Sequence, residues 1–283
     1  MIRLDNVVKQ YDKFRLDCSM QVLAGQVTGL IGRNGAGKST TFKAMLGLID
    51  IEGGTVEVLG TPVKNLTAKD REQIGVVLAD SGFSGYLTIK DLIPVLNTLY
   101  ADFSPKQFMA DCERMELPMK KKIKEFSTGM KRKLQILAAL SHNARLLILD
   151  EPTAGLDVVA RDELLNLLRE YMETGERSIV ISSHISSDLE GICDDVYMIE
   201  NGRMLLHEDT DVLLNEYGLL KVSFEQFGRL DQRYLIRKKK ESFGYSCLTN
   251  KRQFYQDNFP SVVLERGSID EVITMLTTNG ESN

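Results

Sequence analysis

The sequence predicts an α/β fold with a largely parallel core sheet, and two features of the chain support this prediction. Three short, almost wholly apolar runs, at residues 27–31, 146–149 and 179–181, have the character of strands that are covered on both faces. Apolar residues at helical spacing follow the first run and separate the other two, within residues 42–49 and 164–172. Strands that alternate with helices are typical of a parallel sheet.

Polar residues follow each of the three apolar runs directly. A glycine-rich stretch begins at Gly32, after the first run. Asp150 and Glu151 follow the second run, and the segment 182–184, Ser-Ser-His, ends the third. In open α/β folds, ligands bind where the carboxyl ends of the parallel strands meet. We therefore expect these polar residues to contribute to one site.

Residues 32–39 read Gly-Arg-Asn-Gly-Ala-Gly-Lys-Ser, which matches the nucleotide-binding P-loop pattern between a strand and a helix. Glycines let consecutive backbone N–H groups curl around phosphate oxygens, and the following helix directs its positive end at them. Lys38 is expected to reach the β- and γ-phosphates of ATP, and Ser39 to bind Mg²⁺. The predicted nucleotide-binding residues of this stretch are Gly32, Asn34, Gly35, Gly37, Lys38, Ser39 and Thr40.

The acidic pair after the second apolar run bears on which reaction the predicted nucleotide site supports. P-loop enzymes hold Mg²⁺ through an acid at the end of a strand, directly or through water, and we assign this role to Asp150. Glu151, one residue later, is suited to polarise or deprotonate a water in line with the γ-phosphate. An acidic pair at a strand end can also be merely solvated, but the upstream P-loop favours ATP hydrolysis.

Two regions outside this core have a different character. Residues 82–142 contain helical patterns separated by prolines and little sequence that resembles a strand. This predicts a helical insertion. In the tail, residues 209–283, short strand-like runs precede a final helix opened by a capping box of Ser268 and Glu271. The predicted organisation is an ATPase domain over residues 1–208, which contains the insertion, and a small C-terminal α/β appendage.

Composition and charge argue against several other classes of protein. The 283 residues are 43% hydrophobic and 27% charged, as in an ordinary folded domain, with a net charge of −5 and a pI near 5.4. An acidic chain argues against nucleic acid as the main partner. The four cysteines form no metal-binding pair, and no apolar run approaches the roughly 20 residues that cross a bilayer. Work at a membrane would therefore need a membrane-spanning partner.

The segment 151–157, Glu-Pro-Thr-Ala-Gly-Leu-Asp, together with His184 after the next strand, resembles the ATPase subunit of an ABC transporter. The resemblance extends over residues 2–208, with the motifs in the family's order. The family's signature Leu-Ser-Gly-Gly-Gln stands here as Phe-Ser-Thr-Gly-Met at residues 126–130. The resemblance implies the P-loop ATPase fold of that family and ATP hydrolysis coupled to transport.

The resemblance also implies roles for residues outside the P-loop. Such subunits close head to tail, so that ATP on one P-loop is capped by the signature of the other chain, here Ser127 and Gly129. His184 would bind the γ-phosphate, orient the attacking water and act in catalysis. Asp157 would lie between the two sites, and Tyr11 matches the aromatic residue that stacks on adenine.

The sequence departs from the family pattern at two places. Ala79 stands where most members have a glutamine that touches Mg²⁺ and relays closure to the membrane subunit, and Asp80 is a candidate metal ligand in its place. In the signature, Thr128 replaces a glycine and Met130 replaces a glutamine. A weakened site in an asymmetric heterodimer is one interpretation, but the chain's own hydrolytic residues are complete and predict retained hydrolysis.

The function that the resemblance implies is ATP hydrolysis by a dimer that drives a separate transmembrane permease. Signatures of the Ser-x-Gly-Met type resemble those of ABC-2 exporters of peptides and antibiotics. Such a subunit would lie in the cytoplasm, peripheral on the inner face of the cell membrane. A soluble, non-transport ABC ATPase and a regulatory module that does not turn over ATP are the alternatives. Whether the second ATPase subunit is identical or a sister chain stays open.

Overall fold

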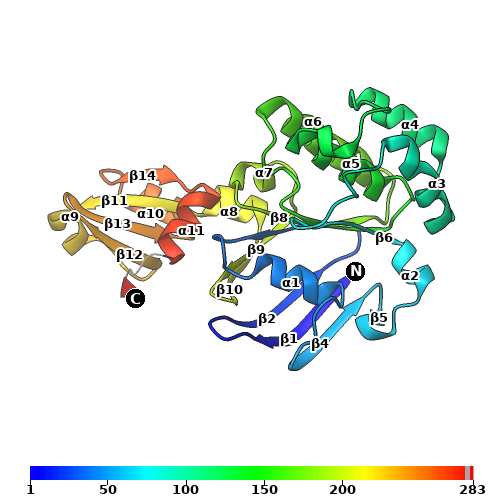
Figure 1. Cartoon of the computed structure of the whole chain (residues 1–283). Helices are drawn as coiled ribbons and strands as arrows, with labels where there is room; N and C mark the ends of the chain where they lie inside the picture. The colour runs from blue at the N-terminus through cyan, green and yellow to red at the C-terminus, as the bar shows by residue number, and fades with distance from the viewer. Residues whose placement is uncertain (278–280, 283) are drawn as a thin grey trace.

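The structure is a computed structural model that describes residues 1–277 and 281–282. Within these residues the longer strands form three sheets, which we call the central, N-terminal and C-terminal sheets. The central sheet lies in the middle of the molecule in Figure 1, the N-terminal sheet lies below it, and the C-terminal sheet forms the part at the left. The first two sheets enclose the helix that follows the P-loop.

The central sheet is covered and largely parallel, as predicted. Its strands run in the order β10-β9-β3-β8-β7-β6, and each neighbouring pair is parallel except β9 with β10. The strands are β3 Val27–Ile31, β6 Ile74–Val77, β7 Leu146–Asp150, β8 Ser178–Ser183, β9 Asp195–Glu200 and β10 Arg203–Asp209. β3, β7 and β8 are buried at every residue, which explains their unbroken apolar sequences and confirms the three predicted strands.

Helices cover both faces of the central sheet. α1, Lys38–Met45, follows β3 through the P-loop and packs between the central and N-terminal sheets. α6, Val158–Met172, lies on the opposite face. Successive residues of β7 alternate between these two cores: Leu147 packs with α6, and Ile148 belongs to the cluster around α1. The strand is therefore held from both sides, which fixes the residues at its carboxyl end.

The antiparallel N-terminal sheet is not anticipated in the sequence analysis. Its strands pair in the order β2-β1-β4-β5 and are β1 Ile2–Gln10, β2 Arg15–Val22, β4 Gly53–Val58 and β5 Thr61–Pro62. Buried residues of β1 and β2, such as Leu4, Val7 and Leu16, share a cluster with Phe42 of α1. The sheet therefore packs against the P-loop helix on the side away from the central sheet.

Between β6 and β7 the chain forms helices with an apolar cluster of their own. They are α3 Ile89–Leu99, α4 Pro105–Arg114 and α5 Thr128–Leu140. Each begins at a hydroxyl N-cap, since the side chains of Thr88, Ser104 and Ser127 accept hydrogen bonds from backbone N–H groups three residues on. We call this part the helical segment; the boundaries 82–142 for a helical insertion stay a prediction.

The tail forms the antiparallel C-terminal sheet, with strand order β14-β11-β13-β12-β15. The strands are β11 Gly218–Ser223, β12 Leu235–Glu241, β13 Gly244–Thr249, β14 Val263–Arg266 and β15 Glu281–Ser282. The predicted capping box at the start of α11, Ile269–Thr277, is confirmed. The Ser268 N–H donates to Glu271 Oε2 at 3.0 Å, and the Glu271 N–H donates to Ser268 Oγ at 3.3 Å. The division of the chain into domains at residue 208 stays a prediction.

α11 packs the tail against the central sheet. Its buried residues Ile269 and Val272 belong to the same apolar cluster as Leu189 on α7, Ser186–Glu190. The Ile269 N–H also donates to Glu190 Oε1 at 3.2 Å. The tail and the ATPase core therefore share one hydrophobic cluster.

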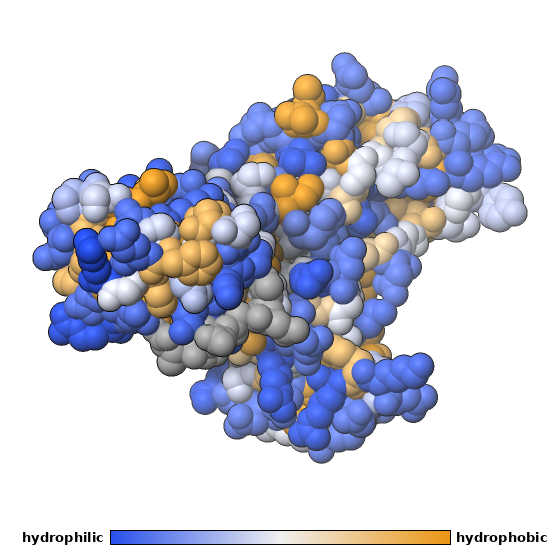
Figure 2. Space-filling model, turned by 90° about the vertical axis from the view of Figure 1, so that its left-hand side faces the viewer, coloured by the Kyte–Doolittle hydropathy of each residue, from blue (hydrophilic) through white to orange (hydrophobic). Residues whose placement is uncertain are grey.

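The remaining helices are short. They are α2 Ala68–Glu72, α8 Thr210–Glu216, α9 Phe224–Arg229 and α10 Arg252–Asn258, with 3₁₀ helices at Val63–Asn65 and Ile123–Glu125. Across the described residues, no helix combines the length and the apolar character needed to span a membrane. Hydrophilic residues cover most of the face shown in Figure 2, where the apolar residues form small, separate groups.

Candidate functional site

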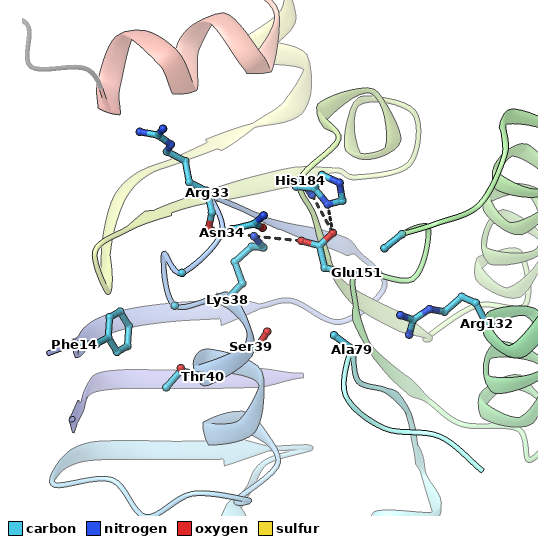
Figure 3. Close-up of a pocket in the computed structure, with 13 residues that line it drawn as sticks. Phe14, Arg33, Asn34, Lys38, Ser39, Thr40, Ala79, Arg132, Glu151 and His184 are labelled. Atoms are coloured by element: carbon cyan, nitrogen blue, oxygen red, sulfur yellow. Dashed lines mark hydrogen bonds and ion pairs between the residues drawn. The ribbon is translucent and has the colours of Figure 1, made fainter. Parts of the chain in front are cut away.

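A pocket of about 610 Å³ opens at the carboxyl ends of β3, β7 and β8. The P-loop, the segment after β6, the helix α5 and the residues after β7 and β8 all contribute to its wall (Figure 3). The lining residues are Phe14, Arg33, Asn34, Gly35, Gly37, Lys38, Ser39, Thr40, Ala79, Arg132, Glu151, Ala154 and His184. The fold thus brings polar residues that follow three separate strands into one cavity.

The P-loop turns tightly between β3 and α1, and its glycines permit that path. Gly35 and Gly37 have φ angles of 82° and 118°, left-handed values that residues with a Cβ rarely adopt. At Gly32, a Cβ would lie 2.3 Å from the carbonyl oxygen of Ile199 on β9, so the loop could not pack there with a larger residue. These positions bring Lys38 into the pocket at the first residue of α1.

Lys38 lies deep in the pocket, with only 6% of its side chain exposed. Its Nζ donates to the carbonyl oxygens of Gly32 at 2.7 Å and Arg33 at 3.4 Å, and lies 3.2 Å from Glu151 Oε1. Such partners are needed because an unpaired buried charge is costly. The ammonium group is therefore fixed where the carboxylate or an incoming phosphate can pair with it.

Glu151 follows β7 in a left-handed backbone conformation, with φ of 52°, which is uncommon for a residue other than glycine. Ser182 on β8 supports this bend: its Oγ accepts from the Glu151 N–H at 2.9 Å and donates to Asp150 Oδ1 at 2.6 Å. The parallel register pairs Asp150 with Ser182 directly. Asp150 is 1% exposed, and Glu151 turns into the pocket beside Lys38.

His184 completes a row of three interacting side chains that Figure 3 shows as dashed lines. Its Nδ1 lies 2.5 Å from Glu151 Oε2, and its backbone N–H donates to the same oxygen at 3.2 Å. Because an ionised carboxylate can only accept, Nδ1 is the donor. Lys38 and His184 thus hold the two oxygens of one carboxylate, and a carboxylate placed this way can take a proton from a nearby water.

Seven of the predicted site residues are not among the described residues that line the pocket: Tyr11, Gly32, Asp80, Ser127, Gly129, Asp150 and Asp157. Asp80 pairs with Lys43 Nζ at 2.8 Å, its side chain is 67% exposed, and the hydrogen bond from Lys43 lowers the pKa of its carboxyl group. Its neighbour Ala79 lines the pocket instead. The ring of Tyr11 is half-exposed and its centroid lies 6.3 Å from that of Phe14, which does line the pocket.

Comparison with known proteins agrees with this geometry. A family profile described as "ABC transporter" matches residues 16–154, and one described as an AAA domain matches residues 122–187. The ABC transporter ATP-binding protein YtrB of Bacillus subtilis (strain 168) is 30% identical over 227 residues, which are 80% of this chain and 77% of that protein. The chain belongs to the ABC transporter ATP-binding proteins. It is the ATP-binding, ATP-hydrolysing subunit of an ABC transporter.

Further relatives of this ABC ATPase support the assignment. The linearmycin resistance ATP-binding protein LnrL of Bacillus subtilis (strain 168) and the bacitracin transport ATP-binding protein BcrA of Enterococcus faecalis are each 33% identical, over 72% of this chain and 68% of their own length. A solved ATP-binding subunit of an ABC transporter superposes with a TM-score of 0.67 at 27% identity, covering 81% of this chain and 93% of that one. The dimeric bacterial cassette MJ0796 has the same fold, with a TM-score of 0.67 at 21% identity over 74% of this chain and 99% of its own. The predicted P-loop ATPase fold is therefore confirmed.

The altered signature of this ABC ATPase lies outside the pocket, at the start of α5. Ser127 is the N-cap of that helix, and its Oγ accepts from the Met130 N–H at 3.2 Å. Gly129 follows in the first turn. Asp157 is the N-cap of α6, where its Oδ1 accepts from the Ala160 N–H at 2.9 Å. Ser127 and Asp157 are exposed, and Gly129 is partly buried.

The structure adds four pocket residues that the sequence analysis does not assign: Phe14, Arg33, Arg132 and Ala154. Arg33 and Ala154 lie inside recognised motifs, so motif spacing could have included them. Phe14 stands only three residues after Tyr11, in the turn between β1 and β2. Arg132 gives no local signal, because it reaches the pocket from α5, a helix that sequence alone does not place beside the P-loop.

Proposed function

We propose that this pocket binds the phosphates of ATP and that Glu151 and His184 act in hydrolysis. The observation that carries the proposal is the row of Lys38, Glu151 and His184 at the ends of neighbouring parallel strands. An incoming γ-phosphate competes with the Glu151 carboxylate for the Lys38 ammonium. The released carboxylate then accepts the proton of the attacking water, and His184 binds the γ-phosphate and keeps the water in line with it.

The other pocket residues hold the remainder of the nucleotide. The backbone of residues 34–37 and the N-terminus of α1 bind phosphate oxygens, because exposed N–H groups and the positive end of the helix point to them. Ser39 and Thr40 lie in the first turn of that helix and line the pocket. Phe14 and the neighbouring Tyr11 offer aromatic faces on which adenine stacks.

Ser39 and Asp150 would hold Mg²⁺. Among the described residues, no three His, Cys, Asp or Glu side chains gather as a ready metal cage. This fits a Mg²⁺ ion that takes most of its ligands from phosphates and water. Asp150 is an acid fixed by Ser182 at the end of β7, which suits a carboxylate that acts on the ion directly or through water. When bound, the ion neutralises charge on the phosphates.

The signature of one chain completes the pocket of a second chain. Ser127 and Gly129 stand at the N-terminus of α5, a helix of 13 residues whose positive end suits the γ-phosphate held by the other copy. Val158 and Val159, which follow Asp157, are 77% and 69% exposed. Adjacent exposed apolar side chains are typical of a surface that another protein covers. Asp157 therefore lies at the dimer interface, between the two sites.

The dimer drives a separate transmembrane permease from the inner, cytoplasmic face of the cell membrane. The names of two relatives refer to linearmycin resistance and bacitracin transport. By this likeness the transported substrate is an antibiotic or an amphipathic peptide, and transport is directed outward. We expect the chain to be recovered with membranes only when its permease is co-expressed.

Complementation between two inactive variants tests the shared site. Lys38→Ala and Ser127→Ala are co-expressed with different affinity tags, and dimers that carry both tags are isolated. Each variant alone is expected to lack ATP hydrolysis, whereas the mixed dimer contains one site with both an intact Lys38 and an intact Ser127 and regains activity. Mixed dimers that stay inactive would show that two copies of this chain do not share the site, and would favour a sister subunit.

A further inference from the structure

Arg132 on α5 places a second cation in the nucleotide pocket. In Figure 3 its side chain extends from the helix into the pocket, toward Ala79 and Glu151 and facing Lys38 across the cavity. Its Nη1 lies 3.4 Å from the carbonyl oxygen of Leu78 and 3.2 Å from Gln135 Oε1. These neutral contacts hold the guanidinium group in the pocket but leave most of its five N–H donors for another partner.

Arg132 lacks the acidic partner that a partly buried arginine usually has. Within residues 1–277 and 281–282, no carboxylate forms an ion pair with it. Burial lowers the pKa of its guanidinium group, and the charges of Asp150 and Glu151 oppose that shift. An arginine stays protonated in proteins, so the pocket contains a partly desolvated cation without a counter-ion of its own. An anionic ligand would supply that counter-ion.

Ala79 leaves room for this side chain. It stands where the family resemblance leads us to expect a glutamine, and it lines the pocket beside Arg132. The carbonyl group that accepts from Arg132 belongs to Leu78, the residue directly before Ala79. The guanidinium group is therefore attached to the same segment after β6 that would otherwise carry the glutamine side chain.

We propose that Arg132 binds the γ-phosphate of the ATP held by its own chain and stabilises the negative charge that develops during hydrolysis. The inference rests on the proposed function, because it requires the triphosphate to occupy this pocket. In the reaction the oxygen of the attacking water bonds to the γ-phosphorus, and the bond from that phosphorus to the β,γ-bridging oxygen breaks. The electron pair leaves with ADP and Glu151 takes the proton of the water. Arg132 transfers nothing; its positive charge lowers the energy of the transition state.

This role links α5 to two sites at once. Ser127 caps the helix and faces the second copy under the proposed function, whereas Arg132, in the second turn of the helix, faces the pocket of its own chain. A movement of the helical segment would therefore shift a γ-phosphate ligand in each pocket of the dimer. Hydrolysis would then require α5 of both subunits to be in the position at which its residues reach the γ-phosphates.

Substitutions of Arg132 test the proposal in the full-length protein. Arg132→Ala removes the side chain, and Arg132→Gln keeps a hydrogen-bond donor near Leu78 but removes the charge. For both, kcat for ATP hydrolysis is expected to fall by about 100-fold or more, the usual loss when one donor to a developing charge is removed. ADP affinity should be unchanged, and trapping of ADP with vanadate, which resembles the transition state, should be lost. Arg132→Lys keeps the charge and should recover part of both readouts.

Two comparisons make the result specific. Arg71→Ala is the matched control, because Arg71 also donates to a backbone carbonyl at 3.4 Å but lies on α2, away from the pocket. It should keep hydrolysis and vanadate trapping. Ala79→Gln in the Arg132→Ala background should restore part of the hydrolysis, since it returns a polar side chain to the same space.

The outcome separates this inference from the proposed function. Glu151→Gln is measured in parallel, and if it still hydrolyses ATP normally the proposed catalytic site is wrong whatever Arg132 does. If Glu151→Gln is inactive while Arg132→Gln traps vanadate and turns over within about threefold of the unmodified chain, only the role of Arg132 is overturned. Loss of hydrolysis and of trapping, with ADP affinity and the thermal unfolding midpoint retained, supports it.

Discussion

At the scale of single residues, the Ser182 hydroxyl holds the two acidic residues of the site in place. It donates to Asp150 and accepts from the backbone of Glu151, so one side chain fixes both the carboxylate and the left-handed bend after it. Without it, a buried carboxylate oxygen and a backbone N–H each lose a partner. The position of Glu151 beside Lys38 therefore depends on a residue of the neighbouring strand.

Replacing Ser182 with alanine should lower both stability and activity. The free energy of unfolding is expected to fall by about 1–3 kcal/mol, because buried polar groups are left without partners. Ser178→Ala is the matched control on the same strand, since the Ser178 hydroxyl is also buried and makes two hydrogen bonds, to Gly25 and Leu23, at the far end of β8. Urea unfolding and ATP turnover are measured for both; equal losses of turnover would contradict a specific role of Ser182.

The site residues that belong to sequence motifs could be predicted from the sequence. Contacts between segments that are distant in the sequence could not. Lys38 and Glu151 are predictable because each follows an apolar strand in a recognisable motif, and His184 because its position resembles the family pattern; the structure places all three at one pocket. Arg132 was missed because nothing in its local sequence shows that α5 faces the P-loop. Asp80 was a candidate ligand by its proximity to Ala79, but in the structure it pairs with Lys43.

At the scale of elements, the P-loop depends on close packing against β9 as well as on left-handed turns. Gly32→Ala should lower the free energy of unfolding by about 1–3 kcal/mol, because its Cβ would meet the Ile199 carbonyl oxygen at 2.3 Å and the loop would have to move. Gly35→Ala is the comparison, since its φ is left-handed but a Cβ there meets nothing within 4 Å. We expect it to cost only about 1 kcal/mol of backbone strain.

Denaturant unfolding of the two variants without nucleotide measures this difference. A Gly35 variant less stable than the Gly32 variant would show that strain, rather than contact with β9, determines the path of the loop.

Strands and helix ends could be predicted where the sequence pattern that identifies them lies within a few consecutive residues. β3, β7 and β8 are unbroken apolar runs because both of their faces are covered, and the Ser268 capping box is a four-residue signal. The N-terminal sheet was missed although its strands alternate buried and exposed residues. β1 pairs with β4, which lies beyond the P-loop and α1, so the pairing depends on contacts remote in sequence.

At the scale of the whole molecule, the tail is packed into the ATPase core. α11 buries Ile269 in the cluster that contains Leu189, so loss of that side chain should destabilise the core as well as the tail. Ile269→Ala is expected to lower the free energy of unfolding by about 2–5 kcal/mol, the usual cost of a large core truncation. Val263→Ala, at a residue 59% exposed on β14, should change it by less than about 0.5 kcal/mol.

Unfolding followed by tyrosine fluorescence, with ATP turnover as a second readout, tests this coupling. We expect one transition in which activity and fluorescence are lost together. A fluorescence change that begins at a lower denaturant concentration than the loss of activity would instead show that part of the chain unfolds independently of the ATPase core.

ATP turnover by Glu151→Gln, measured beside its ATP affinity, tests the central claim most directly. Glu151 is the proposed proton acceptor for the attacking water, and Lys38 is the phosphate ligand that the carboxylate holds until ATP arrives. The variant is expected to bind ATP as tightly as the unmodified chain or more tightly, while turnover falls by about 100-fold or more. Turnover that stays within about tenfold of the unmodified chain would contradict the assignment of Glu151 as the catalytic carboxylate.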